Sequence, residues 1–173
     1  MARLVPAVPQ AFPDQPITAT AWNSFVYAAG FHMRAPSALL TQTISQSVPT
    51  STSTRIAFDS AVRDTEGGHD PVNNNTRYTV KTPGTYLVSA SAGMFLAGSA
   101  GGEESVAIIA NEAVIWAIIL FGRDLTFSRM GGCATAEIPL QTGDYVETQL
   151  WQDSGQTESN GVGAWMGLHW VGL

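Results

Sequence analysis

Pro-Gly-Thr-Tyr-Leu-Val-Ser-Ala-Ser-Ala-Gly-Met-Phe-Leu, residues 83–96, predicts a long β-strand introduced by a turn. Proline presets its own φ and glycine accepts the positive φ that most residues avoid, so Pro83-Gly84 is a turn pair. One face of the strand is apolar throughout: Tyr86, Val88, Ala90, Ala92, Met94 and Leu96. The other face is small or partly apolar: Thr85, Leu87, Ser89, Ser91, Gly93 and Phe95. The first face should lie on a core, and we expect the second to be covered as well.

Further short β segments lie on both sides of this strand. The segments we expect are 37–48, 55–58, 77–80, 106–110, 113–121, 125–127, 133–140, 145–151 and 164–171. Asn111-Glu112 predicts a hairpin turn, Gly131-Gly132 a bulge or kink, and residues 59–75 a polar loop. Eight to ten short strands with turn-rich links are typical of an all-β sandwich or barrel.

Two of these segments carry more apolar surface than one core face needs. Ala113–Phe121 has no charge, and because an exposed run of this kind favours aggregation, we expect a central strand covered on both faces. The last segment has two largely apolar rows: Trp165, Gly167, His169 and Val171, and Ala164, Met166, Leu168 and Trp170. One row can fill the core, and the other needs cover from a second subunit or, alternatively, from the N-terminal helix of the same chain.

The sequence predicts that residues 1–36 form an extended arm followed by a short helix, and that residues 37–173 form a β domain. Prolines at 6, 9, 13 and 16 favour an extended path for residues 1–17. The arm carries apolar groups suited to gripping a partner, although packing on its own domain is the alternative: Leu4, Val5, Val8, Phe12 and Ile17. Residues 18–30 predict an amphipathic helix, capped by Thr18 or Thr20, with a stripe of Trp22, Phe25, Val26, Ala29 and Met33.

The composition favours an oligomer and excludes some partners. Charged residues make up only 13% of the chain, against about 25% in a typical soluble domain. Interface cores are depleted of charge, which would account for the difference. The net charge of −6 argues against nucleic acid or an anionic membrane as partner. The prolines leave no apolar segment for a secretory signal, so we expect folding in the cytosol.

Neither a metal site nor a catalytic centre is predicted. Asp59, Asp64, Glu66, His69 and Asp70 cluster in one segment without EF-hand spacing, so a solvated loop is favoured over calcium. No nucleophile elbow, zincin, P-loop or dinucleotide motif is present. The single cysteine, Cys133, lies among small and apolar residues and is expected to be a buried thiol. We therefore expect no cofactor and a structural or binding role.

From about Ser37 to Leu173 the chain resembles the jelly-roll domain of the complement C1q and tumour-necrosis-factor superfamily. The resemblance rests on four ordered motifs, Ile56-x-Phe58, Tyr78-Thr79-Val80, Pro83-Gly84-x-Tyr86 and Gly143-Asp144-x-Val146, and on Trp165-Met166-Gly167-Leu168 near the end. Met166 and Leu168 depart from the serine and aromatic residue expected there. The resemblance implies an antiparallel jelly-roll sandwich, a homotrimer, and an interface that includes Trp165, His169, Val171, Leu87 and Phe95.

The N-terminal part is similar to small virion proteins of tailed bacteriophages, through Thr-Ala-Thr-Ala-Trp-Asn at 18–23. This similarity implies a non-enzymatic capsid decoration protein, found in the virion after assembly in the host cytoplasm. It would grip the major capsid protein or another virion protein through its arm. The alternative is a head-fibre or tail-fibre tip whose loops at 59–75, 97–102 and 153–161 bind a host surface glycan or protein. An enzyme such as a glycan depolymerase is disfavoured, because no candidate acid pair is present.

Overall fold

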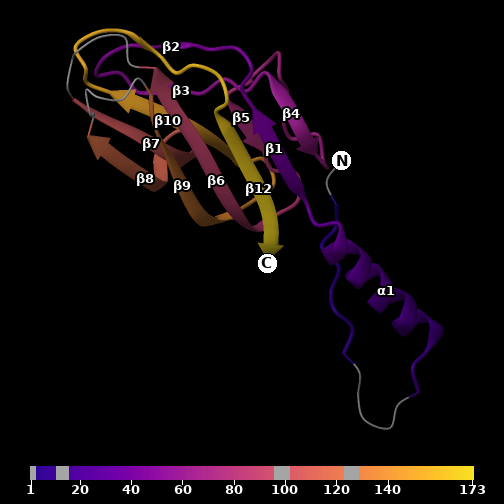
Figure 1. Ribbon diagram of the computed structural model, residues 1–173. Coiled ribbons are helices and arrows are strands. Elements are labelled where there is room, and N and C mark those ends of the chain that lie inside the picture. Colours follow the sequence, from indigo (N-terminus) through magenta and orange to yellow (C-terminus); the bar gives the residue numbers. More distant parts are fainter. Residues whose placement is uncertain (1–2, 11–15, 96–101, 123–128) are drawn as a thin grey trace.

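The computed structural model describes residues 3–10, 16–95, 102–122 and 129–173 and consists of one helix and two antiparallel sheets (Figure 1). The larger sheet has seven strands in the order β2-β11-β6-β12-β1-β4, with β9 pairing β6. The smaller has five, in the order β3-β10-β7-β8, with β5 pairing β10. The elements are α1 (Ala19–Met33), β1 (Ser37–Thr41), β2 (Ser47–Val48), β3 (Thr54–Arg55), β4 (Ser60–Asp64), β5 (Arg77–Thr79), β6 (Gly84–Phe95), β7 (Glu103–Ala110), β8 (Val114–Gly122), β9 (Arg129–Leu140), β10 (Tyr145–Gln152), β11 (Glu158–Ser159) and β12 (Trp165–Gly172).

The core lies between the two sheets, and β6 supplies its longest row. The predicted apolar face of this strand is buried: Tyr86, Val88, Ala90, Ala92 and Met94 are all at most 4% exposed. Leu96 lies outside the described residues. Phe58 and Met166 are among the fully buried side chains that meet this row. The prediction of an antiparallel β-sandwich is therefore confirmed, with β6 and β12 side by side in the larger sheet.

The Pro83-Gly84 turn is fitted closely to Trp170. Gly84 has a φ of 145°, and a Cβ on it would lie 2.1 Å from Trp170 Nε1. The indole nitrogen donates to the Pro83 carbonyl at 3.1 Å. Glycine is therefore required both for the backbone conformation and for the space that the tryptophan occupies.

The prediction that Ala113–Phe121 is a central, doubly covered strand is wrong. It forms β8, the last strand in the order of the smaller sheet, joined to β7 by the predicted Asn111-Glu112 turn. Six of its side chains are between 37% and 58% exposed: Val114, Ile115, Trp116, Ile118, Ile119 and Leu120. The run has no charge, yet the described part of this chain leaves these six side chains partly exposed.

Two other local predictions are also wrong. Gly131 and Gly132 lie inside β9 in unbroken register with Gly93 and Ala92 of β6, not in a bulge. Close approach accounts for both glycines. A Cβ on Gly131 would lie 2.9 Å from the Ala92 carbonyl oxygen, and one on Gly132 would lie 2.8 Å from side-chain atoms of Ile119 and Phe121. The polar segment 59–75 contains strand β4, which pairs with β1. Residues 125–127, expected to be a strand, lie outside the described residues.

The predicted N-terminal helix is confirmed, although it continues beyond Gly30 to Met33, and it projects away from the sandwich (Figure 1). The Thr18 side chain caps it by accepting from the Ala21 N–H at 3.2 Å. Only Ala28 and Phe31 are buried, and Phe31 packs edge-on against Trp170 with ring centroids 5.1 Å apart. The helix therefore does not cover the second face of β12, and the alternative in which it does is wrong.

Replacing Trp170 by alanine should destabilise the fold severely. The side chain is 3% exposed, and its loss removes the contact with Phe31, the hydrogen bond to Pro83 and a large buried volume. We expect the free energy of unfolding to fall by about 3–5 kcal/mol, measured by urea denaturation. The matched control is Trp165→Ala, five positions earlier in β12 and therefore on the opposite face of the strand. Its side chain is partly exposed and faces outward, so the loss should be clearly smaller. Equal losses would contradict the assignment of the two faces.

Candidate functional site

The larger sheet has one face on the core and one face open, and this open face is the first candidate interaction surface. It is formed by the outward side chains of β1, β6, β9 and β12. They are Leu39, Thr41, Leu87, Ser89, Ser91, Cys133, Thr135, Glu137, Trp165, Gly167, His169 and Val171. Gly167, Ser89 and Thr135 form a row of small residues across the middle strands, with the two hydroxyl oxygens 3.0 Å apart. Small side chains there leave the sheet accessible to close approach by another surface.

The structure brings most of the predicted interface residues together on this open face. His169 is the cross-strand partner of Leu87, and Trp165 and Val171 lie on the same row of β12. Phe95 stands apart at the far end of β6, where its ring fills the space that a side chain on Gly161 would need. Their role in subunit contact stays a prediction.

Cys133 is exposed, and the prediction of a buried thiol is wrong. Its neighbours in sequence are small and apolar, but strand alternation places Ala134 in the core and Cys133 on the open face opposite Ser91. Composition around a residue does not determine its side of a strand; register does.

The β8 edge, defined as Val114–Gly122, is the second candidate interaction surface. Ile118 and Leu120 are 49% and 58% exposed. Ile119 and Phe121 contact the neighbouring β9, because a Cβ on Gly132 would lie 2.8 Å from atoms of both side chains. The edge therefore offers apolar side chains together with the backbone groups of an outermost strand.

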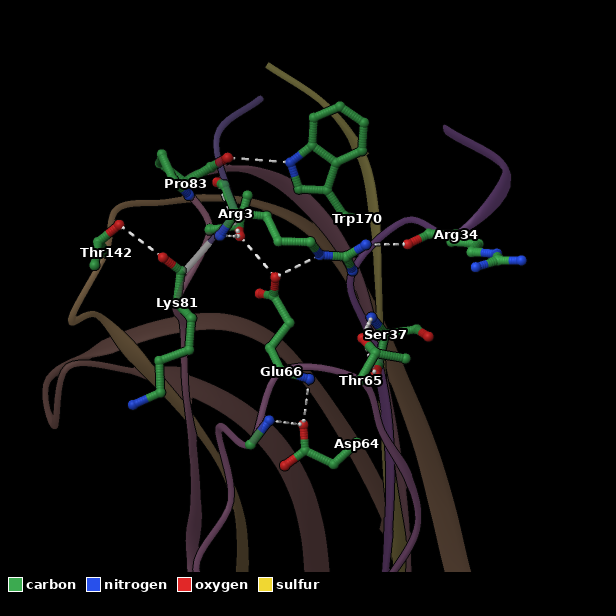
Figure 2. A network of polar contacts seen from close by, with 12 residues as sticks. Arg3, Arg34, Ser37, Asp64, Thr65, Glu66, Lys81, Pro83, Thr142 and Trp170 are labelled. Atoms are coloured by element: carbon green, nitrogen blue, oxygen red, sulfur yellow. Dashed lines mark hydrogen bonds and ion pairs between the residues drawn. The ribbon is translucent and has the colours of Figure 1, made fainter. Parts of the chain in front are cut away.

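A third feature is the junction of the N-terminal arm with the sandwich, shown in Figure 2. Arg3 donates from Nε to Glu66 Oε1 at 3.0 Å and from NH1 to the Arg34 carbonyl at 2.6 Å. The Thr82 hydroxyl donates to the same Glu66 oxygen at 2.8 Å and accepts from the Arg3 N–H at 3.0 Å. The Glu66 side chain is 1% exposed. A buried carboxylate needs such partners, so the junction fixes residue 3, the end of the helix and the turn before β6 together.

The predicted arm residues divide into two groups. Val5 packs against the core of its own chain, as the alternative reading of the arm required. Leu4, Val8 and Ile17 are 80%, 63% and 72% exposed and are free to contact another molecule. Phe12 lies outside the described residues.

The acidic segment uses its carboxylates to hold the backbone. Asp64 accepts from the N–H groups of Glu66, Gly67 and His69, and Asp59 from the N–H and hydroxyl of Thr43. Desolvation raises the pKa of Asp59, but the hydrogen bonds from Thr43 outweigh it and the net pKa is lowered. Hydrogen bonds from the Asn73 and Val72 N–H groups lower the pKa of Asp70. Within the described ranges, no group of three or more His, Cys, Asp or Glu residues could hold a metal ion.

At the end of the sandwich away from α1, side-chain amides tie the loops together. Asn160 donates to Gln42 Oε1 and accepts from the Gln46 N–H, and Gln46 Nε2 donates to the Arg55 carbonyl at 2.7 Å. The Gln152 side-chain amide likewise donates from Nε2 to the carbonyls of Val48 and Gln156. The loop 153–161 is thus held on a buried polar network. Two other loops are predicted to bind a host surface. In the segment 59–75, residues 65–68 lie at the opposite end, beside the arm junction, and of the loop 97–102, residues 97–101 are outside the described ranges.

No helix in the described part of the chain is both long enough and apolar enough to span a membrane.

Comparison with known proteins defines the fold more closely than the sequence does. No protein-family model matches the chain, and no curated protein sequence matches it significantly. Among solved structures, the globular domain of zebrafish complement 1qA protein is similar, with a TM-score of 0.57 and 12% identity over 79% of this chain and 97% of that one. Murine APRIL is also similar, at a TM-score of 0.57 and 10% identity for the pH 5.0 structure, over 79% of this chain and 98% of that one.

A second structure of murine APRIL, at pH 8.0, gives a TM-score of 0.56 with 13% identity and the same coverage. The two packed antiparallel sheets therefore define a jelly-roll sandwich. Its particular form is the C1q/TNF-like jelly roll, as the resemblance predicted.

Arg3→Ala should loosen the arm from the sandwich. The substitution leaves the buried Glu66 carboxylate without its guanidinium partner and frees the Arg34 carbonyl. We expect faster amide hydrogen exchange at residues 3–10 and 31–36, and a modest loss of stability because the Arg3 side chain is 32% exposed.

The matched control for this prediction is Arg63→Ala, which removes an exposed arginine from β4 without touching the junction. Unchanged exchange at residues 3–10 in Arg3→Ala would show that the arm is held by other contacts.

Proposed function

We propose that this chain is a non-enzymatic structural protein that assembles as a homotrimer and decorates the capsid of a tailed bacteriophage. The observation that carries the trimer is the presence of two separate uncovered surfaces on one chain with only 13% charged residues. They are the β8 edge, which is apolar, and the open face, where Leu87 and Val171 are exposed among small and polar residues. Monomeric soluble proteins rarely leave contiguous apolar patches of this kind uncovered.

The arrangement of the two surfaces favours a closed ring. They belong to different sheets, so the β8 edge of one copy meeting the open face of the next is a heterologous contact. Repeated contacts of this type close into a ring when the rotation permits. A three-membered ring is the form implied by the resemblance to the C1q and tumour-necrosis-factor superfamily.

The N-terminal region supports attachment to a larger assembly. The helix projects from the sandwich (Figure 1), and Leu4, Val8 and Ile17 are exposed apolar side chains on the arm. The base of the arm is fixed by Arg3, so a trimer would present three arms from one end. Three weak contacts to a symmetric capsid lattice gain affinity through effective concentration. The partner would be the major capsid protein or another virion protein, and the protein would reside in the virion.

The second candidate function is a fibre tip that binds a host surface glycan or protein. It is favoured by the loop 153–161, which lies at the end away from α1 and is held by the Gln42, Gln46 and Asn160 network. Preorganised polar loops suit adaptable surface recognition.

The trimer can be tested through the single cysteine. Cys133 lies on the open face and is exposed in one subunit, so in the assembly it should react with a maleimide far more slowly than after denaturation. Leu87→Asp, which places a charge on the same face, should give a monomer by light scattering and fast labelling of Cys133.

The matched control is Val72→Asp, the same type of change at an 82% exposed loop position, which should leave the mass and the labelling rate unchanged. A monomeric native chain, or full trimer mass in Leu87→Asp, would contradict the proposed assembly.

The capsid role can be tested with arm variants that keep the junction intact. Leu4→Ser combined with Val8→Ser removes two exposed apolar side chains and should weaken co-sedimentation with empty capsids by about tenfold or more, because the loss repeats in each subunit. Ile44→Ser combined with Val72→Ser removes similar exposed groups from the sandwich and serves as the control. If the arm variant bound capsids at full affinity and loop 153–161 variants lost binding to host cells, the fibre-tip function would replace the capsid one.

A further inference from the structure

Helix α1 carries an apolar stripe that the described part of its own chain leaves exposed. The helix stripe consists of the predicted residues Trp22, Phe25, Val26, Ala29 and Met33. Its four large side chains are 57%, 51%, 51% and 85% exposed in the order Trp22, Phe25, Val26, Met33. Residues 19–33 contain no Asp, Glu, Lys or Arg. A surface helix normally places charged or polar residues outward, so this stripe calls for a specific cover.

The described contacts of the arm with the helix centre on the side opposite the stripe, although Arg3 also lines a hollow with Val26 and Met33. Successive residues of an α-helix are rotated by about 100°, which puts Ala28 and Phe31 on the side opposite Trp22. These two are the buried residues of α1. The Arg3 guanidinium lies over the Phe31 ring at 5.5 Å from its centroid. The contacts with its own chain therefore bury the opposite side of the helix, and the large side chains of the stripe keep half or more of their surface exposed.

The helix also needs tertiary packing in order to be stable. It has 15 residues, near the length at which isolated helices are marginal in water even with favourable sequences. Its sequence is unfavourable, since it contains Gly30, Asn23 and several aromatic or β-branched residues. The contacts of Ala28 and Phe31 lie in its second half. In the first two turns the described side-chain contacts are local to the helix: the Thr18 cap, the Ser24 hydroxyl bond to the Thr20 carbonyl and the Trp22–Phe25 ring contact.

The stripe is continuous with the open face of the sheet. Met33 and His32 of the helix line the same hollow as His169 of β12. The helix leads directly into β1, a strand of the larger sheet, and the Phe31–Trp170 contact and the Arg3 bond to the Arg34 carbonyl fix its direction. If the open faces of three subunits surround a three-fold axis, the three α1 helices, each fixed at one end of its larger sheet, lie close to the same axis.

We propose that the three α1 helices of the trimer pack on one another through their stripes as a parallel bundle, so that the occupant of each stripe is the same helix of the other two copies. This inference rests on the proposed homotrimer. The stripe alone is too small to hold subunits together. The exposed half of its two aromatic and three smaller side chains amounts to roughly 300–400 Å², against about 800 Å² per partner in a stable interface. The bundle therefore extends the sheet contact, and it leaves Leu4 and Val8 outside for a capsid.

Paired cysteine variants in a Cys133→Ser background test the bundle. Ala29→Cys places a thiol in the middle of the stripe, and Ser24→Cys places one on an exposed position of the opposite side. In native trimers under mild oxidation, we expect Ala29→Cys to form intersubunit disulfides about tenfold faster or more, because thiols within one assembly meet at millimolar effective concentration. The measurement is the fraction of disulfide-linked dimer on a non-reducing gel over time.

The outcomes separate this inference from the proposed function. Trimer mass with equally slow oxidation at both positions would overturn the bundle while leaving the trimer intact. A native mass of one subunit would overturn both. Val26→Asp places a charge in the stripe, and its control Ser24→Asp places the same charge on the opposite side of the helix. If Val26→Asp abolished capsid binding while Ala29→Cys failed to cross-link, the occupant of the stripe would be the capsid, and the bundle would again be wrong.

Discussion

The packing of Trp170 joins three parts of the chain that are far apart in sequence. Its ring fills the space that Gly84 leaves, its indole N–H bonds the Pro83 carbonyl, and its edge meets Phe31 of α1. The start of β6, the end of β12 and the end of the helix are thereby held at one corner of the sandwich. A rigid corner matters for the proposed trimer, because the direction of α1 relative to the larger sheet would decide which surfaces a neighbouring subunit could reach.

Next to this corner, the Arg3–Glu66–Thr82 network extends the same constraint to the N-terminal arm (Figure 2). Burial raises the pKa of Tyr86 above its ordinary value, which keeps the phenol protonated as the donor to the Thr82 carbonyl at 2.6 Å. A buried carboxylate is costly unless it is paired. The paired Glu66 carboxylate therefore fixes the place where the arm leaves the sandwich. The exposed arm residues beyond Val5 make few contacts with the rest of the chain.

Features that strand alternation and turn chemistry determine could be predicted from the sequence. Features that depend on contacts between residues distant in the chain could not. The alternating faces of β6, the Asn111-Glu112 turn and the Thr18 cap are local, and the structure agrees with each. The environment of Cys133 depends on the register of β9, and the junction at Arg3 depends on Glu66 and Thr82, 63 and 79 residues away. No spacing rule signals such contacts, because the fold alone brings them together.

The error over β8 has a different cause and leads to a physical conclusion. An uncharged apolar strand implies cover, but hydrophobicity does not say whether that cover comes from the same chain. The open face, the β8 edge and the helix stripe are three apolar surfaces of one subunit, and an exposed edge strand readily pairs with other chains. A freely dissociating subunit would therefore be prone to open-ended association. In the proposed trimer, closure into a ring would cover all three surfaces at once and leave no free edge to propagate. Folding and assembly would then be coupled, and the measured stability would depend on protein concentration.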